Sequence, residues 1–204
     1  MLIGLDFDNT IVSYDGLFHQ VALEKSLIPA DVPQSKLAVR DYLRGVGKED
    51  AWTEMQGYVY GARMVDAAPY PGAIEFMRLA RQGGISLAIV SHKTRYPFLG
   101  PRYDLHEAAR SWVKSQLAAQ DLIDPGQVFF ELTKDDKIRR VAGIGCDYFV
   151  DDLPEILMAP TFPRKTATVL FDPERAHRKE KVGARFESWQ DIAQHFEAIW
   201  KTCR

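Results

Sequence analysis

Five short apolar runs set the strongest limit on how this chain can fold. They comprise residues 2–5, 85–90, 128–130, 148–150 and 168–171. Runs of this length that do not alternate with polar residues are typical of strands buried on both faces of a parallel sheet. Segments with a helical pattern lie between or after them, at 71–83, 104–119, 135–142 and 188–200. Strands that alternate with helices predict an α/β fold with a doubly wound parallel sheet.

One stretch, residues 14–68, interrupts this alternation. It contains no convincing strand, and three helical patterns cover 17–27, 35–43 and 49–64. The sequence therefore predicts an α/β core made of residues 1–13 and 69–204, with residues 14–68 as a helical cap inserted after the first strand. Ligands of doubly wound sheets bind at the carboxyl ends of the strands. We expect the insert to lie over that edge and to act as a lid.

The composition argues against several classes of partner. The formal net charge of the 204 residues is −2, without a long run of one sign, so we expect neither nucleic acid nor an anionic membrane surface to bind. No apolar run is long enough to span a membrane and no signal-peptide pattern is present, which predicts a cytoplasmic protein. Of the two cysteines, Cys146 is expected to be buried and Cys203 lies in the C-terminal tail, without zinc-ligand spacing. The oligomeric state is not readable from the sequence.

Reactive side chains follow four of the apolar runs. They are Asp6 and Asp8, then Ser91, then Thr133, Lys134 and Lys137, and finally Asp151 and Asp152. Parallel strands present their carboxyl ends at one edge of the sheet, so the sequence predicts that these side chains converge there. The pair Asn9-Thr10 favours a turn, which would end the first strand near Asp6 and let both of the first two aspartates face that edge.

Such a cluster has a definite chemistry. Carboxylates that converge repel each other unless a cation joins them. A hard, oxygen-ligated ion such as Mg²⁺ fits Asp6 and Asp152. One carboxylate can attack phosphorus while another handles protons. Ser91 and Lys134 can hold phosphoryl oxygens as their charge changes in the transition state.

The order of these groups resembles the haloacid dehalogenase superfamily over nearly the whole chain. The segment Asp6-Phe-Asp-Asn-Thr10 is similar to the family's first motif, Asp-x-Asp-x-Thr. Ser91 after an apolar run is similar to the second motif, and Asp151-Asp152 is similar to the acidic pair of the fourth. Four motifs in this order, each at a strand end, are far more specific than the first motif alone.

The resemblance implies a mechanism and a metal. Asp6 would form an aspartyl-phosphate, and Asp8 would protonate the leaving group and then activate water. Mg²⁺ would be held by Asp6, the backbone carbonyl of Asp8 and Asp152, with support from Asp151. A second aspartate at the position of Asp8 is found in the phosphatases of the family and not in its dehalogenases. The helical insert is similar to the family's smaller cap type.

The lysine of the third motif has two candidates in the segment Thr133-Lys-Asp-Asp-Lys137. We prefer Lys134, because it lies nearest the strand end, and keep Lys137 as the alternative.

Residues for substrate binding are less clearly marked. His92 and Lys93 belong to a basic, polar run after Ser91, which either contacts substrate or forms a solvated loop. Trp52 and Tyr58 in the insert either line a substrate pocket or pack inside the helices.

These features predict a Mg²⁺-dependent phosphomonoesterase that acts on a small phosphorylated metabolite, such as a sugar phosphate or a nucleotide. A phosphomutase or phosphotransferase of the same superfamily would use the same Asp6 and is not separated from it by sequence. A non-catalytic phospho-acceptor or scaffold domain is the remote alternative. Response-regulator receiver domains combine similar groups, but their acidic pair precedes the phosphorylated aspartate, whereas here it follows the serine and the lysine.

Overall fold

The computed structural model describes residues 1–202, with side chains through Trp200. Cys203 lies outside the described residues. The chain divides into two compact units, which are described separately. The core unit comprises Met1–Val12, Pro69–His92 and the chain from Gln116 onward, and the inserted unit comprises Ser13–Ala68 and Lys93–Ser115. Within the described part of the chain, no helix combines the length and the apolar character needed to cross a membrane.

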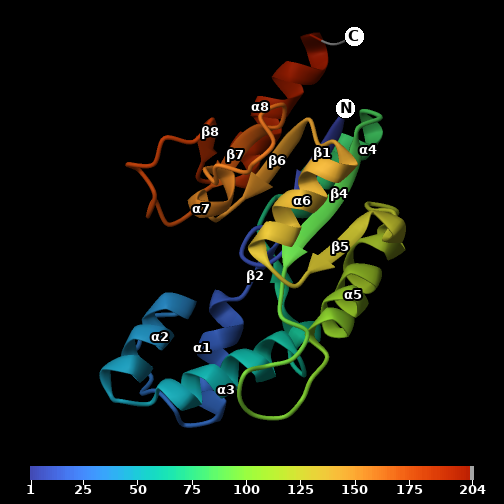
Figure 1. Cartoon of the computed structure of the whole chain (residues 1–204). Helices are drawn as coiled ribbons and strands as arrows, with labels where there is room; N and C mark the ends of the chain where they lie inside the picture. Colours follow the sequence, from blue (N-terminus) through green and yellow to red (C-terminus); the bar gives the residue numbers. More distant parts are fainter. Residues whose placement is uncertain (203–204) are drawn as a thin grey trace. The chain divides into compact units, whose positions relative to one another are not determined.

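The core unit is built on a six-stranded sheet with the order β5-β4-β1-β6-β7-β8, in which neighbouring strands run parallel (Figure 1). The strands are β1 (Leu2–Leu5), β4 (Ser86–His92), β5 (Val128–Glu131), β6 (Tyr148–Asp151), β7 (Ala167–Phe171) and β8 (Ala184–Phe186). The predicted α/β class and the five strands expected from the apolar runs are confirmed. The edge strand β8 was missed, because Ala184-Arg-Phe186 is too short and too polar to stand out as an apolar run.

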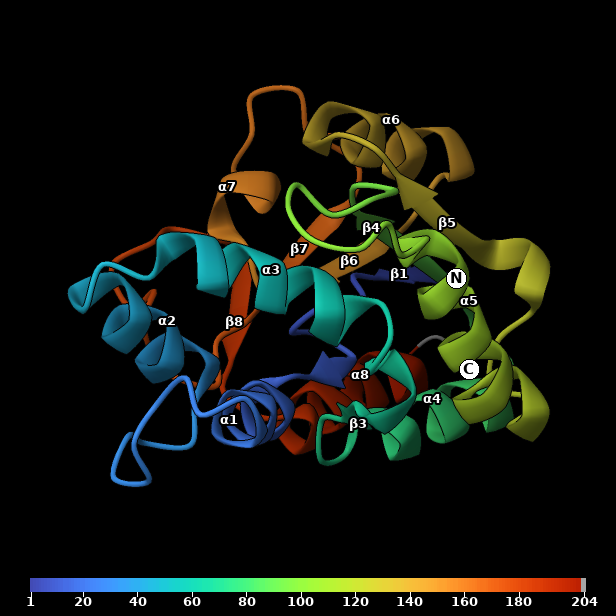
Figure 2. The same ribbon diagram turned by 90° about the horizontal axis from the view of Figure 1, so that it is seen from below.

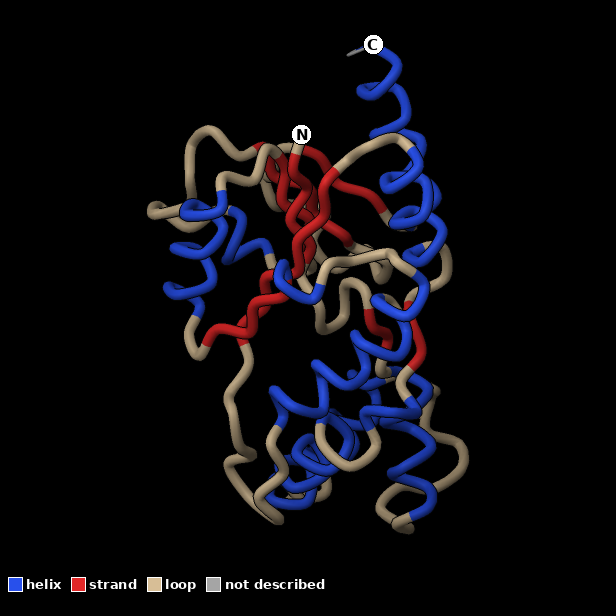
Figure 3. The backbone as a smooth tube through the Cα atoms, turned by 90° about the vertical axis from the view of Figure 1, so that its right-hand side faces the viewer, coloured by secondary structure: helices blue, strands red, loops and turns tan. Residues whose placement is uncertain are grey.

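Helices cover both faces of this sheet (Figure 2). On one face lie α4 (Ala73–Gln82) and α8 (Trp189–Thr202), which contact each other, and on the other lie α6 (Lys134–Ile144) and the short α7 (Pro154–Leu157). Figure 3 shows the red strands with blue helices on either side. The 3₁₀ turns η2 (Ala118–Gln120) and η3 (Pro125–Gln127) lead into β5.

Local chemistry explains where the long helices begin. Gly72 takes a φ of 90° at the start of α4, a left-handed conformation that glycine adopts without strain. Ser188 accepts a hydrogen bond from the backbone N–H of Asp191 at 3.1 Å and caps α8, and Thr133 does the same for Asp136 in α6 at 3.1 Å. The caps expected at Ser188 and Thr133 are therefore confirmed.

Apolar packing closes both faces. Between α4 and α8, Phe76 packs against Trp189 and Phe196, with ring centroids 5.1 and 5.5 Å apart. On the opposite face Ile138 and Val141 of α6 pack in one cluster with Phe149 of β6. Cys146 is buried in this cluster, as expected. The close packing holds β1, β4 and β6 in fixed register, which positions the side chains at their carboxyl ends.

The inserted unit is helical. It contains α1 (Asp15–Glu24), α2 (Lys36–Gly45), α3 (Glu49–Tyr60), the turn η1 (Met64–Asp66) and α5 (Leu105–Gln116) as far as Ser115. Two very short strands, β2 (Val12–Ser13) and β3 (Ala68–Pro69), pair where the chain enters and leaves the first inserted segment. Helices α1, α2 and α3 contact one another in pairs and bury Phe18, Val39 and Trp52.

The segment 93–115 belongs to the inserted unit by its contacts, whereas the sequence placed it in the core. Gly57 of α3 and Gly61, which directly follows this helix, allow the close packing. A Cβ at Gly57 would lie 2.6 Å from Cβ of Pro97, and one at Gly61 would lie 2.5 Å from Cβ of Tyr103. The indole N–H of Trp112 also donates to the carbonyl of Ala67 at 2.8 Å. The assignment of residues 14–68 as a cap domain stays a prediction.

Candidate active site

Asp6 stands at the carboxyl end of the central strand β1. Its backbone N–H donates to the carbonyl of Val150 at 2.8 Å, and the residue is only 3% exposed. The chain then turns sharply, because Asn9 has a φ of 59° and the N–H of Ile11 returns to the carbonyl of Phe7 at 3.1 Å. The predicted turn after Asp6 is therefore present. Asp8 lies within this turn and is half-buried.

Lys137 provides the cation of the cluster. Its ammonium lies 2.7 Å from Oδ1 of Asp6 and 2.6 Å from Oδ2 of Asp151, and all of its side chain is buried. It is the fourth residue of α6, followed by the buried Ile138 and, one turn later, Val141. This helical spacing puts Lys137 on the face that packs against the sheet.

The preference for Lys134 is wrong. Lys134 is the first residue of α6, its side chain is half exposed, and it forms an ion pair with Glu155 on the surface. Closeness to the strand end misled the prediction. The two lysines lie on neighbouring positions of one helix face, about 4.5 Å apart along the axis, and only Lys137 reaches Asp6 and Asp151. The apolar pattern does not separate them, because Ile138 and Val141 lie at helical spacing from both lysines.

Asp151 and Asp152 follow from β6, the other neighbour of β1. Asp151 is fully buried and accepts the backbone N–H of Leu153 at 3.0 Å as well as pairing with Lys137. Asp152 is half-buried, and its Oδ1 lies 3.4 Å from the hydroxyl of Thr10. The same hydroxyl lies 3.4 Å from Oδ2 of Asp6. Thr10 thus connects Asp6 to the acidic pair, a role that sequence reasoning, which treated it as a turn residue, did not assign.

Ser91 is placed by strand register. β1 and β4 pair with Leu5 opposite Ile89, so Ser91 lies two residues beyond that pair and Asp6 lies one residue beyond it, on adjacent parallel strands. Ser91 is 1% exposed. His92 follows it, and its buried Nδ1 makes no hydrogen bond. The structure therefore brings Asp6, Ser91, Lys137 and Asp151 to one edge of the sheet.

The charges in this cluster shift the pKa values of its members. Burial alone would lower the pKa of Lys137, but the carboxylates of Asp151 and Asp6 raise it above its ordinary value. Burial raises the pKa of Asp151, and the negative charge of Asp6 acts in the same direction, while Lys137 opposes both. Burial and the charge of Lys137 lower the pKa of His92, which favours the neutral ring. Groups shifted in this way are typical of functional sites.

The donor set fits a hard divalent cation. Carboxylate oxygens of Asp6, Asp151 and Asp152 lie within 4.8 Å of one another. Lys137 contacts the first two, and one ammonium does not balance three neighbouring carboxylates. Oxygen ligands of this type suit Mg²⁺ better than zinc, which prefers histidine and cysteine. Both carboxylate oxygens of Asp151 are engaged, Oδ1 by the N–H of Leu153 and Oδ2 by Lys137, so Asp6 and Asp152 are the better ligands.

The other candidates for substrate binding belong to the inserted unit. Lys93 is 7% exposed with its ammonium 4.5 Å from the ring centroid of Tyr60. The ring of Trp52 packs against that of Phe18, with the centroids 5.0 Å apart. This contact agrees with the expectation that Trp52 packs inside the helices. Tyr58 is half-buried and meets the ammonium of Lys25 at 4.2 Å. Their part in substrate binding stays a prediction.

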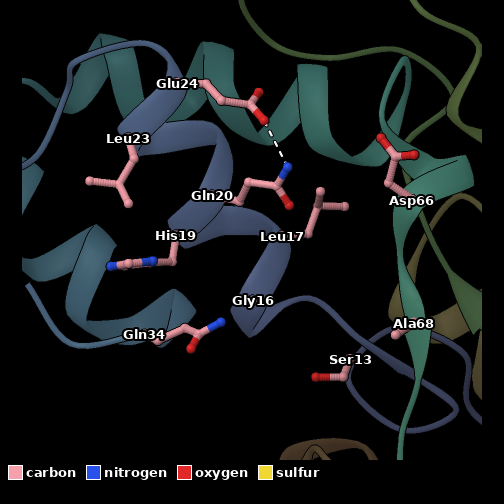
Figure 4. A pocket seen from close by; sticks show the side chains of 10 residues that line it. All are labelled: Ser13, Gly16, Leu17, His19, Gln20, Leu23, Glu24, Gln34, Asp66 and Ala68. Carbon is pink, nitrogen blue, oxygen red and sulfur yellow. Dashed lines mark hydrogen bonds between the residues drawn. The ribbon is translucent and has the colours of Figure 1, made fainter. Parts of the chain in front are cut away.

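A surface pocket of about 470 Å³ also lies in the inserted unit, along α1 (Figure 4). Gln20 and Glu24 line it, and the amide of Gln20 donates to Glu24 at 2.8 Å, as the dashed line in Figure 4 shows. Glu24 and Asp66, which both line the pocket, pair with Arg63 at 2.5 Å each. The charged groups that line this pocket are acidic, so it does not suit a phosphorylated ligand.

Solved structures and a sequence relative are similar to this chain over nearly its whole length. No family profile matches the chain. Among solved structures, the "HAD FAMILY HYDROLASE" of Deinococcus radiodurans R1, which holds phosphate and sodium, superposes with a TM-score of 0.60 at 15% identity, covering 98% of this chain and 96% of the other. A "predicted phosphatase" from Clostridium acetobutylicum superposes with a TM-score of 0.63 at 12% identity, covering 97% and 98%.

The chain has the haloacid dehalogenase fold. The resemblance seen in the sequence motifs is thus confirmed at the level of the fold. A sequence relative was also found: a protein of Oceanobacillus iheyensis named "Putative nucleotidase OB0422" is 24% identical over 205 residues, 96% of this chain and 98% of the relative. In this fold, side chains from the carboxyl ends of β1, β4 and β6 and Lys137 of α6 gather at one edge of the sheet, and their role as an active site stays a prediction.

Proposed function

We propose that this protein is a phosphatase of the haloacid dehalogenase type, a Mg²⁺-dependent phosphomonoesterase that acts on a small phosphorylated metabolite. One observation carries the proposal: Lys137 joins Asp6 to Asp151 in a buried cluster at the carboxyl end of the central strand, with Ser91 on the adjacent strand. A buried network that holds a carboxylate nucleophile beside a cation is costly to build for stability alone.

Asp6 is the proposed nucleophile. One of its carboxylate oxygens attacks phosphorus, the bond from phosphorus to the substrate's leaving oxygen breaks, and Asp8 gives that oxygen a proton. In the second step Asp8 takes a proton from water, the water oxygen attacks phosphorus, and the bond between phosphorus and Asp6 breaks to release phosphate. Asp6 returns to its starting form, and no further reactant is needed.

Lys137 and Ser91 act on the phosphoryl group. The ammonium of Lys137 holds the carboxylate of Asp6 in place, since it lies 2.7 Å from one of its oxygens. It can also donate to a phosphoryl oxygen as charge develops in the transition state, and the hydroxyl of Ser91 can do the same from the next strand. Mg²⁺ would be held by Asp6 and Asp152 with the backbone carbonyl of Asp8, and it would supply charge neutralisation for the transferred phosphoryl group.

A sugar phosphate or a nucleotide is the proposed substrate. The relative named as a nucleotidase puts nucleotides first among the substrates to test. A phosphomutase or phosphotransferase would share the first step and pass the phosphoryl group to an acceptor other than water. Analysis of the products with and without a sugar or nucleoside acceptor separates these two outcomes.

The proposal is tested by a screen of nucleotides and sugar phosphates, with p-nitrophenyl phosphate as a general probe, in the presence of Mg²⁺. Asp6→Asn is run beside Asp135→Asn, a matched change at an exposed aspartate in the first turn of α6. We expect release of phosphate by the wild type and by Asp135→Asn, and a loss of about a thousandfold or more in Asp6→Asn. Full activity of Asp6→Asn would overturn the proposal.

A further inference from the structure

His92, the last residue of β4, has a buried nitrogen without a hydrogen-bond partner. The residue is half-buried, and its Nδ1 is fully covered yet makes no hydrogen bond. Nε2 also bonds no other residue of the described chain, but this nitrogen is not buried. A buried polar atom that stays unpaired costs stability, and native structures keep few of them. The ring of His92 is therefore not held by hydrogen bonds, as that of a structural histidine would be.

Two histidines within the inserted unit show the structural pattern. Nε2 of His19 lies 2.9 Å from the carbonyl of Val32, and Nε2 of His106 lies 2.7 Å from the carbonyl of Lys93. Each of these rings connects its helix to a loop. His92 makes no such connection, which leaves its accessible nitrogen for a ligand.

The ring of His92 lies on the side of the core sheet that α6 covers. Side chains alternate along a strand, so His92 points to the same side as Val90. Val90 packs in one cluster with Ile138 of α6. The charges of Lys137 and Asp6 both act on the pKa of His92, which agrees with this placement. His92 therefore lies on the same side of the sheet as Lys137.

Strand register places His92 further out than Asp6. Leu5 pairs with Ile89 in the parallel ladder of β1 and β4. Asp6 is one residue beyond that pair and His92 is three, so the two Cα atoms are about 8 Å apart on adjacent strands. A nucleophile attacks phosphorus in line with the leaving oxygen, so the leaving group points away from Asp6. His92 therefore lies beside the leaving group and not behind the nucleophile.

The burial of Nδ1 also assigns the proton of the ring. A neutral imidazole carries a single N–H. On Nδ1 this N–H would be a buried donor without an acceptor, an arrangement that native structures avoid. On Nε2 it can reach a ligand. We therefore assign the proton to Nε2, which makes this nitrogen a hydrogen-bond donor.

We propose that His92 recognises the leaving group, and that its Nε2–H donates a hydrogen bond to an oxygen on the carbon next to the phosphorylated one. The inference rests on the proposed phosphatase function. Phosphate esters of sugars and other polyols carry such an oxygen, either as a hydroxyl or as a ring oxygen, and so do nucleotides. Simple alkyl and aryl phosphate esters lack it.

The test compares matched compounds that differ in this oxygen. One pair is glycerol 3-phosphate against n-propyl phosphate, and the other is 5′-AMP against its carbocyclic analogue, in which a CH₂ group replaces the ring oxygen. Each is measured as a competitive inhibitor of p-nitrophenyl phosphate hydrolysis, so turnover of the compound itself is not needed. The readout is the ratio of the two inhibition constants within one variant, so a change in overall activity cancels.

The variants are His92→Gln and His92→Asn, with His195→Gln as the control. The amide nitrogen of glutamine can stand near the position of Nε2, whereas that of asparagine reaches only the position of Nδ1. His195 is also half-buried, but it lines a pocket with the first residues of β6, β7 and β8, at the opposite edge of the sheet.

We expect the wild type and His195→Gln to bind the oxygen-bearing member of at least one pair about tenfold more tightly, the effect of one hydrogen bond. His92→Gln should keep most of this preference, and His92→Asn should lose it. A loss of fold alone would not separate these two variants.

The outcomes distinguish this inference from the proposed function. If p-nitrophenyl phosphate is hydrolysed and the wild type shows no preference, or His92→Asn keeps it, or His92→Gln loses as much as His92→Asn, the role of Nε2 is wrong while the phosphatase function stands. If no phosphorylated compound, including p-nitrophenyl phosphate, is hydrolysed, the proposed function fails and this inference falls with it.

Discussion

Buried lysines behave differently in the two units. In the core unit Lys137 is fully buried and lies within 2.7 Å of two carboxylates. In the inserted unit Lys93 is nearly buried and its ammonium faces the ring of Tyr60, which Lys36 also approaches. A lysine between carboxylates is held by charges of fixed position, whereas a ring face attracts an ammonium more weakly. The first arrangement suits a catalytic centre, whose charged groups must keep one fixed geometry.

The largest loss of stability and activity is expected when Lys137 is replaced, and it tests whether this lysine differs from those of the inserted unit as described. Lys137→Met leaves Asp6 and Asp151 buried without their cation, so we expect a loss of about 3–5 kcal/mol in the free energy of unfolding, measured by denaturant titration without Mg²⁺. The activity on p-nitrophenyl phosphate should fall about a thousandfold. The matched Lys134→Met removes an exposed ion pair and should change stability by less than about 1 kcal/mol. Equal effects of the two variants would contradict the placement of the catalytic lysine.

Removal of the divalent cation is the next effect in size. Chelation with EDTA should abolish activity, and Mg²⁺ at a hundred times its dissociation constant should raise the free energy of unfolding by about 2.7 kcal/mol, because it binds only the folded site. Asp152→Asn should remove most of this stabilisation by Mg²⁺. An unfolding temperature that does not respond to Mg²⁺ in the wild type would show that the three carboxylates hold no such ion.

A smaller effect is expected at the glycines that fix the segment of Lys93. Gly61→Ala forces a methyl group against Tyr103, and we expect a loss of about 1–3 kcal/mol in the free energy of unfolding, measured by denaturant titration. Gly45→Ala, at a helical position with open space around it, is the control and should be neutral or slightly stabilising. If Gly61→Ala leaves stability unchanged, the segment is not held as described.

The smallest effect concerns the hydroxyl of Thr10. Its contacts to Asp6 and Asp152 are long, at 3.4 Å each. Thr10→Val keeps the shape and removes the hydroxyl, so we expect a loss of about 1 kcal/mol and a fall in kcat of about tenfold or less. Denaturant titration and steady-state kinetics with p-nitrophenyl phosphate provide the two readouts. A loss as large as that of Lys137→Met would mean that Thr10, rather than the lysine, organises the cluster.

Much of the fold was predictable because it depends on local patterns. Short apolar runs identified five of the six sheet strands, and capping residues such as Thr133 and Ser188 fixed where helices begin. The edge strand β8 escaped because one alanine, one arginine and one phenylalanine give no periodic signal. Pairing with β7 creates it, and that is a tertiary interaction.

The site was predictable in type and order, but not in every residue. Strand ends located Asp6, Ser91 and Asp151 without knowledge of the fold. The choice between Lys134 and Lys137 depends on which turn of α6 lies beside the buried carboxylates, a tertiary contact that the strand-end argument did not consider. The grouping of 93–115 with the inserted helices depends on Gly57 and Gly61 meeting residues about forty positions away, a contact that no local pattern reveals.

The central claim is that Asp6, held by Lys137, accepts the phosphoryl group. It is tested most directly by acid-quenching the Asp8→Asn variant during reaction with a phosphorylated substrate and mapping the modified peptide by mass spectrometry. Because Asp8 is proposed to activate the hydrolytic water, this variant should accumulate phosphate on Asp6 as a hydroxylamine-sensitive acyl phosphate. Phosphate found on another residue, or rapid turnover by Asp8→Asn with Asp6 unmodified, would contradict the account.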